Sequence, residues 1–309
     1  MPGTIGAARR AEPAILTEQL SKEYGGKAAL SDLTMTVPRG QVFGFLGPNG
    51  AGKTTAVKLL LGLARPTAGE GLVLGEPLGD VAVRRRVGYL PELFRYQDWL
   101  TAEEVLLAHG ALAARPSAAR RGEAQAVLEV VGLAGRARDR VGTFSKGMQQ
   151  RLGLAVALLG APELVVLDEP TSALDPTGRH DVREIIHDLK SRGVTVFLNS
   201  HLLGEVEQVC DHVAILRAGR VVAQGSLDVL LSSTGVRIEA DGVTSGTLQG
   251  LERFGEIFLR GTELQVDGIR RQDIPALVAE LVARGAQVYA VESRRPSLEE
   301  HFLGLMGGR

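Results

Sequence analysis

The residues of this chain best suited to chemistry lie in a glycine-rich stretch, residues 47–55, which reads GPNGAGKTT. The spacing fits G-x-x-x-x-G-K-[ST], the pattern of a phosphate-binding loop. Its glycines let backbone N–H groups converge on phosphate oxygens, and the helix that follows adds the positive end of its dipole. In such a loop Lys53 reaches the β- and γ-phosphates of a nucleotide, and Thr54 binds Mg²⁺. The alternative is a glycine-rich turn that contains a lysine by chance.

The sequence on either side favours the phosphate loop over a chance turn. The apolar run QVFGFLG, residues 41–47, leads into the loop and predicts a strand. A helix is predicted directly after the loop, with one apolar face made of Ala56, Leu59, Leu60 and Leu63. Strand, loop and helix in this order are the context that the pattern requires.

Two neighbouring acidic residues close a second apolar run. LVVLDEP, residues 164–170, has the composition of a strand buried in a parallel sheet. Asp168 would deliver a carboxylate to Mg²⁺ at the carboxyl edge of that sheet. Glu169 would orient and deprotonate an attacking water. Acidic residues at a strand end are often only solvated, but together with the phosphate loop this pair predicts nucleotide hydrolysis.

His201 closes a third apolar run, FLNSH, at residues 197–201. A lone histidine at a strand end is usually structural. If this strand lies in the same sheet as the other two, however, the histidine is carried to the edge where a γ-phosphate would lie. We therefore include His201 in the candidate site.

The rest of the chain predicts an α/β core and a smaller second domain. Residues 14–40 alternate and turn at Gly25-Gly26, which indicates antiparallel strands. Helices are predicted within 93–160 and at 178–191, a strand at 194–200, and a hairpin turning at Ala218-Gly219. Strands that alternate with helices are typical of α/β proteins. We expect a tail at 1–13, an α/β domain at 14–231 and an α+β domain at 232–309.

The expected C-terminal domain has its own pattern. VRIEA, EIFLRG, ELQVDG and AQVYAVES predict four strands. One helix face is formed by Ile274, Leu277, Val278, Leu281 and Val282 and is closed by Gly285. Ser297 and Glu300 predict a capping box before a last helix with Leu298, Phe302 and Leu305 inward.

Composition narrows the class of protein. The net charge of −1 argues against nucleic acid as the main partner. No run approaches the ~18 uncharged apolar residues of a membrane span, and the N-terminal residues lack the apolar region of a secretory signal. We expect a cytosolic protein, with any attachment to a membrane made through a partner.

Taken in order, six motifs across residues 14–230 resemble those of the ATP-binding subunits of ABC transporters: GPNGAGKTT, GYLPE, FSKGMQQR, LVVLDEP, SALD and NSH. The GYLPE and SKGM variants and the ending SLEEHFLGLMG look most like subunits that energise exporters of drugs, lipids or polysaccharides. The resemblance implies a P-loop NTPase core with an antiparallel β subdomain and a helical signature subdomain. It also implies ATP and Mg²⁺ as ligands, a homodimer, a separate multi-span permease and a position at the cytoplasmic side of the membrane.

Site residues carry over from the resemblance one by one. The loop contacts would be Gly47, Asn49, Gly50, Ala51, Gly52, Lys53, Thr54 and Thr55. Asp168 matches the metal ligand, Glu169 the catalytic glutamate and His201 the γ-phosphate histidine. Asp175 matches the loop that links paired sites. Tyr24 matches the aromatic residue that stacks on adenine, the alternative being a packed strand tyrosine.

FSKGMQQR, residues 144–151, matches the signature motif. Ser145 is well placed to cap a helix whose inward face is Leu152, Ala155, Val156 and Leu159. A cap does not explain Gly147. The resemblance implies that Ser145 and the Gly147 amide meet the ATP held by Lys53 of a second copy.

Two departures from the family pattern affect coupling more than ATP binding. Glu92 stands where the family usually has a glutamine that senses Mg²⁺ and the membrane subunit, and we include it among the metal and nucleotide ligands. In the signature, Lys146 and Met148 replace a glycine and a glutamine.

Residues 89–99 contain Tyr89, Phe94, Tyr96 and Trp99, the chain's one tryptophan. These aromatics either pack the helical subdomain or form a groove for a helix of a membrane subunit, since aromatics are favoured at interface centres. Two other functions are weighed against a transporter subunit: an ABC ATPase that acts outside transport, and a nucleotide-gated regulatory module without turnover.

Overall fold

The computed structural model describes residues 12–172, 174–231, 235–294 and 297–307. The chain divides into two compact units, Met1–Gly225 and Ser226–Arg309, which are described separately below. The division lies a few residues before the predicted boundary at 231/232. Ser226 is the N-cap of a short helix, α9 (Leu227–Leu230), whose residues cluster with the second unit.

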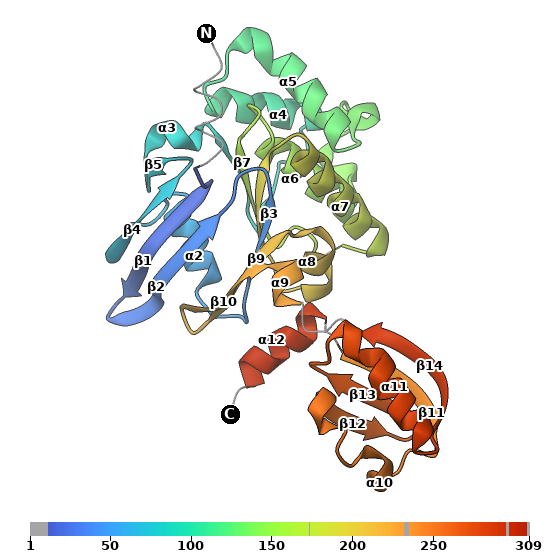
Figure 1. The fold of residues 1–309 in the computed structure, drawn as a ribbon. Helices are drawn as coiled ribbons and strands as arrows, with labels where there is room; N and C mark the ends of the chain where they lie inside the picture. The colour runs from blue at the N-terminus through green and yellow to red at the C-terminus, as the bar shows by residue number, and fades with distance from the viewer. Residues whose placement is uncertain (1–11, 173, 232–234, 295–296, 308–309) are drawn as a thin grey trace, which may run out of the picture. The chain divides into compact units, whose positions relative to one another are not determined.

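The first unit begins with an antiparallel sheet (Figure 1). Its strands are β1 (Ile15–Tyr24), β2 (Lys27–Val37), β4 (Ala68–Val73) and β5 (Glu76–Pro77), in the order β2-β1-β4-β5. Tyr24 pairs with Lys27 across Gly25 and Gly26, both at positive φ, which confirms the predicted turn. Sequence patterns missed β4 because AGEGLV holds two glycines, which have low strand propensity.

A six-stranded sheet forms the centre of this unit. Its strands are β3 (Val42–Leu46), β6 (Val87–Leu90), β7 (Leu164–Asp168), β8 (Thr195–Asn199), β9 (His212–Arg217) and β10 (Arg220–Ser226). Their order is β10-β9-β3-β8-β7-β6, and β9, β3, β8, β7 and β6 pair in parallel. Every residue of β3, β7 and β8 is buried, as the continuous apolar runs predict. The hairpin at Ala218-Gly219 is confirmed.

Helix α2 (Lys53–Leu60) packs between the two sheets. Its Ala56, Val57 and Leu59 share one core with Phe43 and Phe197 of the central sheet and with side chains of β1 and β2. The prediction that Leu63 extends this apolar face is wrong. The helix ends at Leu60, Gly62 turns the chain at φ 65°, and Leu63 is 62% exposed.

Helices α3 (Val81–Arg84), α4 (Ala102–Leu112), α5 (Ser117–Val130), α6 (Lys146–Ala157), α7 (Pro176–Ser191) and α8 (Leu203–Val209) complete the unit. Short 3₁₀ turns at Ala134–Arg136 and Val141–Thr143 join α5 to α6. Helices α4, α5 and α6 contact one another, and α6 and α7 contact β6 and β8 respectively. Leu152 and Ala155 of α6 are buried as predicted, but Val156 and Leu159 are only partly buried, and Leu159 lies beyond the end of the helix at Ala157.

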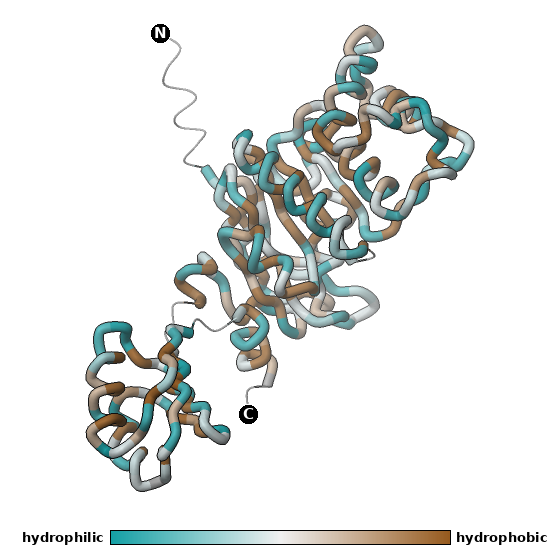
Figure 2. The backbone as a smooth tube through the Cα atoms, turned by 90° about the vertical axis from the view of Figure 1, so that its right-hand side faces the viewer, coloured by the Kyte–Doolittle hydropathy of each residue, from teal (hydrophilic) through white to brown (hydrophobic). Residues whose placement is uncertain are grey.

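Figure 2 shows that hydrophobic segments run through the interior of the first unit, where the strands of the central sheet lie. The outer helices and turns carry a mixture of polar and hydrophobic residues. None of the described helices is long and apolar enough to cross a membrane.

The second unit is a four-stranded antiparallel sheet with helices. Strands β11 (Gly235–Asp241), β12 (Glu256–Arg260), β13 (Glu263–Asp267) and β14 (Gln287–Arg294) lie in the order β12-β13-β11-β14. Its helices are α9, α10 (Ser245–Leu248), α11 (Ile274–Ala283) and α12 (Leu298–Gly307), with 3₁₀ turns at Glu252–Phe254 and Arg271–Asp273. The four predicted strands are thus confirmed.

Helix α11 supplies Leu277 and Leu281 to the core of this sheet, while Val282 is 53% exposed, contrary to prediction. Val282 lies next to Leu281 in the chain, and successive helical positions face different sides. The capping box is confirmed, since Ser297 N–H donates to Glu300 and Glu300 N–H donates to Ser297 Oγ. Leu298 is buried, and Phe302 and Leu305 are partly buried.

Candidate nucleotide site

The candidate site lies at the carboxyl edge of the central sheet, where β3, β7 and β8 end. The phosphate loop follows β3, Asp168 and Glu169 stand at the end of β7, and His201 follows β8. Asp168 pairs with Asn199 across β7 and β8, and Asn199 pairs with Phe45 of β3. Because parallel strands end on the same side, the register brings together three motifs that lie far apart in the sequence.

The phosphate loop is held closely by its neighbours. A Cβ at Gly52, where φ is 104°, would lie 2.4 Å from the Ala29 carbonyl oxygen, and a Cβ at Gly47 would lie 2.4 Å from the Leu216 carbonyl oxygen. Gly219 N–H also donates to the Ala51 carbonyl. Glycine is therefore required at both positions by backbone contacts of the folded unit. At Gly50 the space around a Cβ is open, and Asn49 and Thr54 are exposed while Thr55 is partly buried.

The Lys53 side chain is buried at the first position of α2. Its ammonium group donates to the Gly47 carbonyl oxygen at 2.6 Å. Burial lowers the pKa of Lys53, and the charges of Glu169, Asp168 and Glu92 act in the opposite direction. The lysine is thus positioned inside its own loop and within the field of three carboxylates.

Asp168 is a buried carboxylate, 4% exposed. Burial raises its pKa, the hydrogen bond from Asn199 Nδ2 to Asp168 Oδ1 lowers it, and the charges of Glu92 and Glu169 raise it further. A bound cation would offset the repulsion among these carboxylates. Proteins usually hold Mg²⁺ through one or two carboxylates together with substrate phosphates, so the donors present at Asp168 and Thr54 fit that ion.

Glu169 and His201 form a pair beside Asp168. Glu169 adopts φ 52°, a left-handed conformation that is uncommon for a residue with a side chain, and its N–H donates to the Asn199 carbonyl at 2.8 Å. Its Oε2 lies 2.7 Å from His201 Nδ1. The Glu169 side chain is 9% exposed and the His201 side chain 51% exposed. The histidine therefore lies between the carboxylate and the surface.

Glu92 and Tyr24 lie at the surface. Glu92 follows β6, and its charge acts on Lys53 and Asp168, which places it near both. Tyr24 ends β1 and is 49% exposed, with Lys22 Nζ 5.0 Å from the centre of its ring. The packed-tyrosine alternative is therefore wrong, while adenine stacking stays a prediction.

Ser145 of the signature motif and Asp175 each cap a helix of this chain. Ser145 Oγ accepts from Met148 N–H at the start of α6, which confirms the predicted N-cap. Asp175 Oδ1 accepts from Gly178 N–H at 2.8 Å and caps α7. A Cβ at Gly147 would meet only Ser145 Oγ, at 3.9 Å, so packing within the chain does not require a glycine there. None of the described hydrogen bonds or ion pairs joins Ser145 or Gly147 to the phosphate loop.

The aromatic residues of 89–99 were predicted either to pack within the helical subdomain or to form a groove for a membrane subunit, and the structure separates them. The rings of Phe94 and Tyr96 lie 5.4 Å apart, and Tyr96 meets His109 edge-on at 5.5 Å, which is packing. Trp99 is 70% exposed and Leu93 is 87% exposed. Packing therefore accounts for Phe94 and Tyr96 but not for Trp99.

Asn199 is a site residue that the sequence patterns missed. Its side chain donates to Asp168 and its carbonyl accepts from Glu169. The available signal was a polar residue at the end of the otherwise apolar run VTVFLN.

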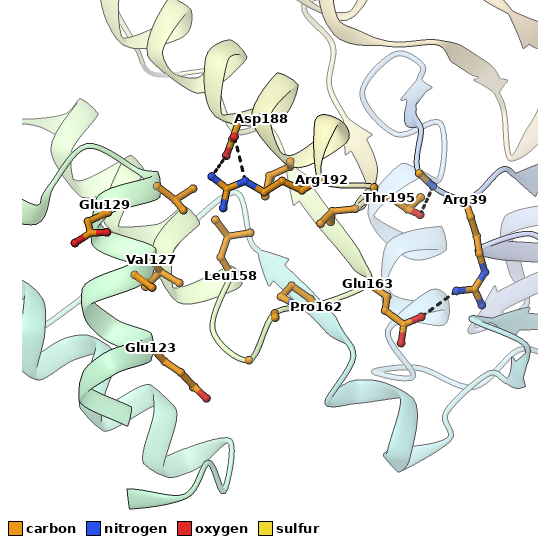
Figure 3. A pocket seen from close by; sticks show the side chains of 18 residues that line it. Arg39, Glu123, Val127, Glu129, Leu158, Pro162, Glu163, Asp188, Arg192 and Thr195 are labelled. Atoms are coloured by element: carbon orange, nitrogen blue, oxygen red, sulfur yellow. Dashed lines mark hydrogen bonds and ion pairs between the residues drawn. The ribbon is translucent and has the colours of Figure 1, made fainter. Parts of the chain in front are cut away.

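A large cavity of about 1250 Å³ lies at the opposite edge of the sheet, at the amino ends of β7 and β8 (Figure 3). Glu163, just before β7, accepts from Arg39 at 2.9 Å and from Arg86 at 2.6 Å. Thr195, which begins β8, donates its N–H to the Glu163 carbonyl and accepts from Gly40 N–H. These contacts tie the beginnings of four strands together, and the cavity is separate from the candidate site.

Comparisons with known proteins define the class. A sequence model described as "ABC transporter" matches residues 30–172, and one described as "AAA domain, putative AbiEii toxin, Type IV TA system" matches residues 139–207. An uncharacterized ABC transporter ATP-binding protein of Synechocystis sp. is 42% identical over 281 residues, with 89% of this chain and 77% of that protein covered. The Nod factor export ATP-binding protein I of Rhizobium sp. is 34% identical over 290 residues, with 93% and 95% covered.

A solved structure of an ATP-binding subunit of an ABC transporter superposes with a TM-score of 0.63 at 33% identity, over 71% of this chain and 92% of that one. The chain belongs to the ABC transporter ATP-binding family. It is an ATPase subunit of an ABC transporter, which confirms the resemblance drawn from the motifs and supports this function over the two alternative functions weighed from the sequence.

Proposed function

We propose that this chain powers export through a separate multi-span permease, that it acts as a homodimer at the cytoplasmic side of the membrane, and that its ATPase activity uses Mg²⁺. The observation that carries the catalytic part is the Glu169–His201 pair, 2.7 Å apart, beside Lys53 and Asp168. Export is supported by the motif variants and by the relative named for Nod factor export.

In the proposed mechanism the buried Glu169 carboxylate accepts a proton from the attacking water. Since Nδ1 of His201 faces Glu169, Nε2 is the ring nitrogen left to contact the γ-phosphate. Lys53 exchanges the Gly47 carbonyl for phosphate oxygens and neutralises their charge. Thr54 and Asp168 would hold Mg²⁺, with Glu92 nearby. When bound, the ion would neutralise charge on the β- and γ-phosphates. The remaining loop residues supply backbone N–H groups, and Tyr24 stacks on adenine.

The homodimer would complete the site. Ser145 and Gly147 lie at the open N-terminal end of α6, a 12-residue helix whose first-turn N–H groups favour an anion. We propose that they contact the nucleotide held by a second copy, with Asp175 at the junction. Gly147 leaves room for close approach because a Cβ there would touch only Ser145.

Glu169→Gln tests this function directly. Loss of the base is expected to slow ATP hydrolysis by roughly 10²–10⁴-fold while ATP binding is retained. With hydrolysis blocked, the variant should elute from gel filtration as a dimer when ATP and Mg²⁺ are present. Lys53→Ala, which removes a phosphate ligand, is the control that should lose ATP binding.

Two results would contradict the proposal. If Glu169→Gln hydrolyses ATP at the wild-type rate, Glu169 is not the catalytic base. If Glu169→Gln binds ATP but stays monomeric in the presence of Mg²⁺, the proposal that two copies share the nucleotide site is wrong.

A further inference from the structure

Strand β8 ends in a buried amide side chain. Asn199 is 2% exposed, while the three residues before it, Val196, Phe197 and Leu198, are apolar and buried. An asparagine at such a position costs free energy unless its polar atoms are hydrogen-bonded. Its contacts therefore need an explanation.

One half of the amide is used by the site. Asn199 Nδ2 donates to Asp168 Oδ1, its partner across the β7–β8 pair. The orientation follows from chemistry, because only the NH₂ group can donate to an ionised carboxylate. The Asn199 carbonyl also accepts from Glu169 N–H at 2.8 Å. Asn199 thus contacts both acidic residues of the candidate site.

The other half of the amide has no partner. Asn199 Oδ1 is buried and accepts no hydrogen bond from any residue that the structure describes. Buried polar atoms are nearly always paired with protein or with ordered water, so a donor from outside the chain is expected at this oxygen. The atom lies on the side chain that holds Asp168, the carboxylate assigned to Mg²⁺ above.

We propose that Asn199 is a positioning residue of the Mg²⁺ site: Nδ2 fixes the Asp168 carboxylate, and Oδ1 accepts a hydrogen bond from a water bound to the metal. Two general properties support this. Carboxylates that bind metals are held by outer hydrogen-bonding partners. Mg²⁺ keeps several of its waters when proteins bind it. The inference rests on the proposed role of Asp168 as a metal ligand.

The test is a matched pair of variants, Asn199→Val and Asn199→Thr. The two side chains have the same shape and suit a strand, but only threonine carries a hydroxyl that donates and accepts. Mn²⁺, a paramagnetic substitute for Mg²⁺, is titrated into the full chain with a non-hydrolysable ATP analogue and followed by electron paramagnetic resonance. Binding of the analogue is also measured in EDTA, without metal.

Asn199→Val is expected to weaken Mn²⁺ binding by about 10- to 100-fold, the usual effect of removing an outer partner of a metal ligand. Asn199→Thr should recover part of that loss. Binding of the analogue in EDTA should change by less than about 3-fold, because the phosphate loop is untouched. Val196→Ala, at a buried position on the opposite face of β8, controls for lost stability and should bind Mn²⁺ as the wild type does.

Equal Mn²⁺ affinity in Asn199→Val and the wild type would overturn the inference. It would also be overturned if Asn199→Val lost affinity for the ATP analogue in EDTA by the same factor as it lost affinity for Mn²⁺. Asp168→Ala separates this outcome from failure of the proposed site. If Asp168→Ala keeps full Mn²⁺ affinity, the metal role of Asp168 is wrong and the inference falls with it. If Asp168→Ala loses Mn²⁺ and Asn199→Val does not, only the role of Asn199 is wrong.

Discussion

Gly52 offers a sharp test of how the fold shapes the phosphate loop. The Gly52→Ala change places a methyl group 2.4 Å from the Ala29 carbonyl oxygen of β2, a distance that real Cβ atoms essentially never show. Gly50→Ala is a matched control in the same loop. Gly50 also has a positive φ, of 80°, but nothing lies within 4 Å of its Cβ position. The difference between the variants isolates the contact with β2.

The magnitudes follow from these geometries. A side chain in the left-handed region costs about 1–2 kcal/mol, and both variants bear this cost. Gly52→Ala must also separate two backbones that strand pairing and α2 hold in place, and such overpacking costs about 1–3 kcal/mol more. For a unit of this size, about 2–4 °C of melting temperature corresponds to each kcal/mol. We expect Gly52→Ala to lower the melting temperature by about twice as much as Gly50→Ala.

The melting temperatures of the wild type and the two variants are measured by differential scanning calorimetry of the full chain without nucleotide. The transition of the first unit is identified as the one that ATP and Mg²⁺ shift upward in the wild type, since a ligand stabilises the unit that binds it. Equal melting temperatures for the two variants would refute the reasoning, because the loop and β2 would then separate at no cost. ATP affinity of Gly52→Ala should fall as well, since the N–H groups at the start of α2 move with the loop.

Two further predictions concern charge and surface. The hydrogen bond with Arg86 holds the pKa of Glu163 in the folded protein below its usual value of 4.5. The pair therefore stabilises the fold fully above pH 4.5, and this stabilisation is lost as the pH falls through the pKa that Glu163 has in the folded protein. Glu163→Gln should therefore be less stable than the wild type at pH 7, with the gap in melting temperature narrowing below pH 4.5; a gap that stays constant on acidification would contradict this. Trp99→Ala should change stability by less than about 0.5 kcal/mol, because the side chain is 70% exposed, while recovery of the permease in a pull-down falls. Unchanged recovery would exclude Trp99 from the permease contact.

Much of the site was predictable because its chemistry depends on residue types at short spacing. GPNGAGKTT specifies a loop and the start of a helix within nine residues, and a carboxylate or histidine that directly follows an apolar run marks the end of a buried strand. The N-cap at Ser145 and the capping box at Ser297 were likewise local, since each hydrogen bond spans three residues.

Features that depend on distant partners were not predictable from these patterns. β4 is stabilised by pairing with β1 rather than by its own glycine-containing sequence. Leu63 continues an apolar helical pattern, but the helix ends at Leu60, the chain turns at Gly62, and Leu63 is exposed. The exposure of Trp99 and the packing of Tyr96, close in sequence, differ because only Tyr96 meets His109 of α4.

By itself, the sequence determined the phosphate loop, the acidic pair, the histidine and the family, because residue types, their spacing within each motif and the order of the motifs are properties of the sequence. Only the tertiary structure decided that these motifs converge, through the parallel register that places Asp168 beside Asn199. The tertiary structure also decided the role proposed for Asn199, since the function of a buried amide side chain depends on which atoms of the neighbouring strand it contacts. Long-range strand pairing supplies those atoms, and no local pattern encodes it.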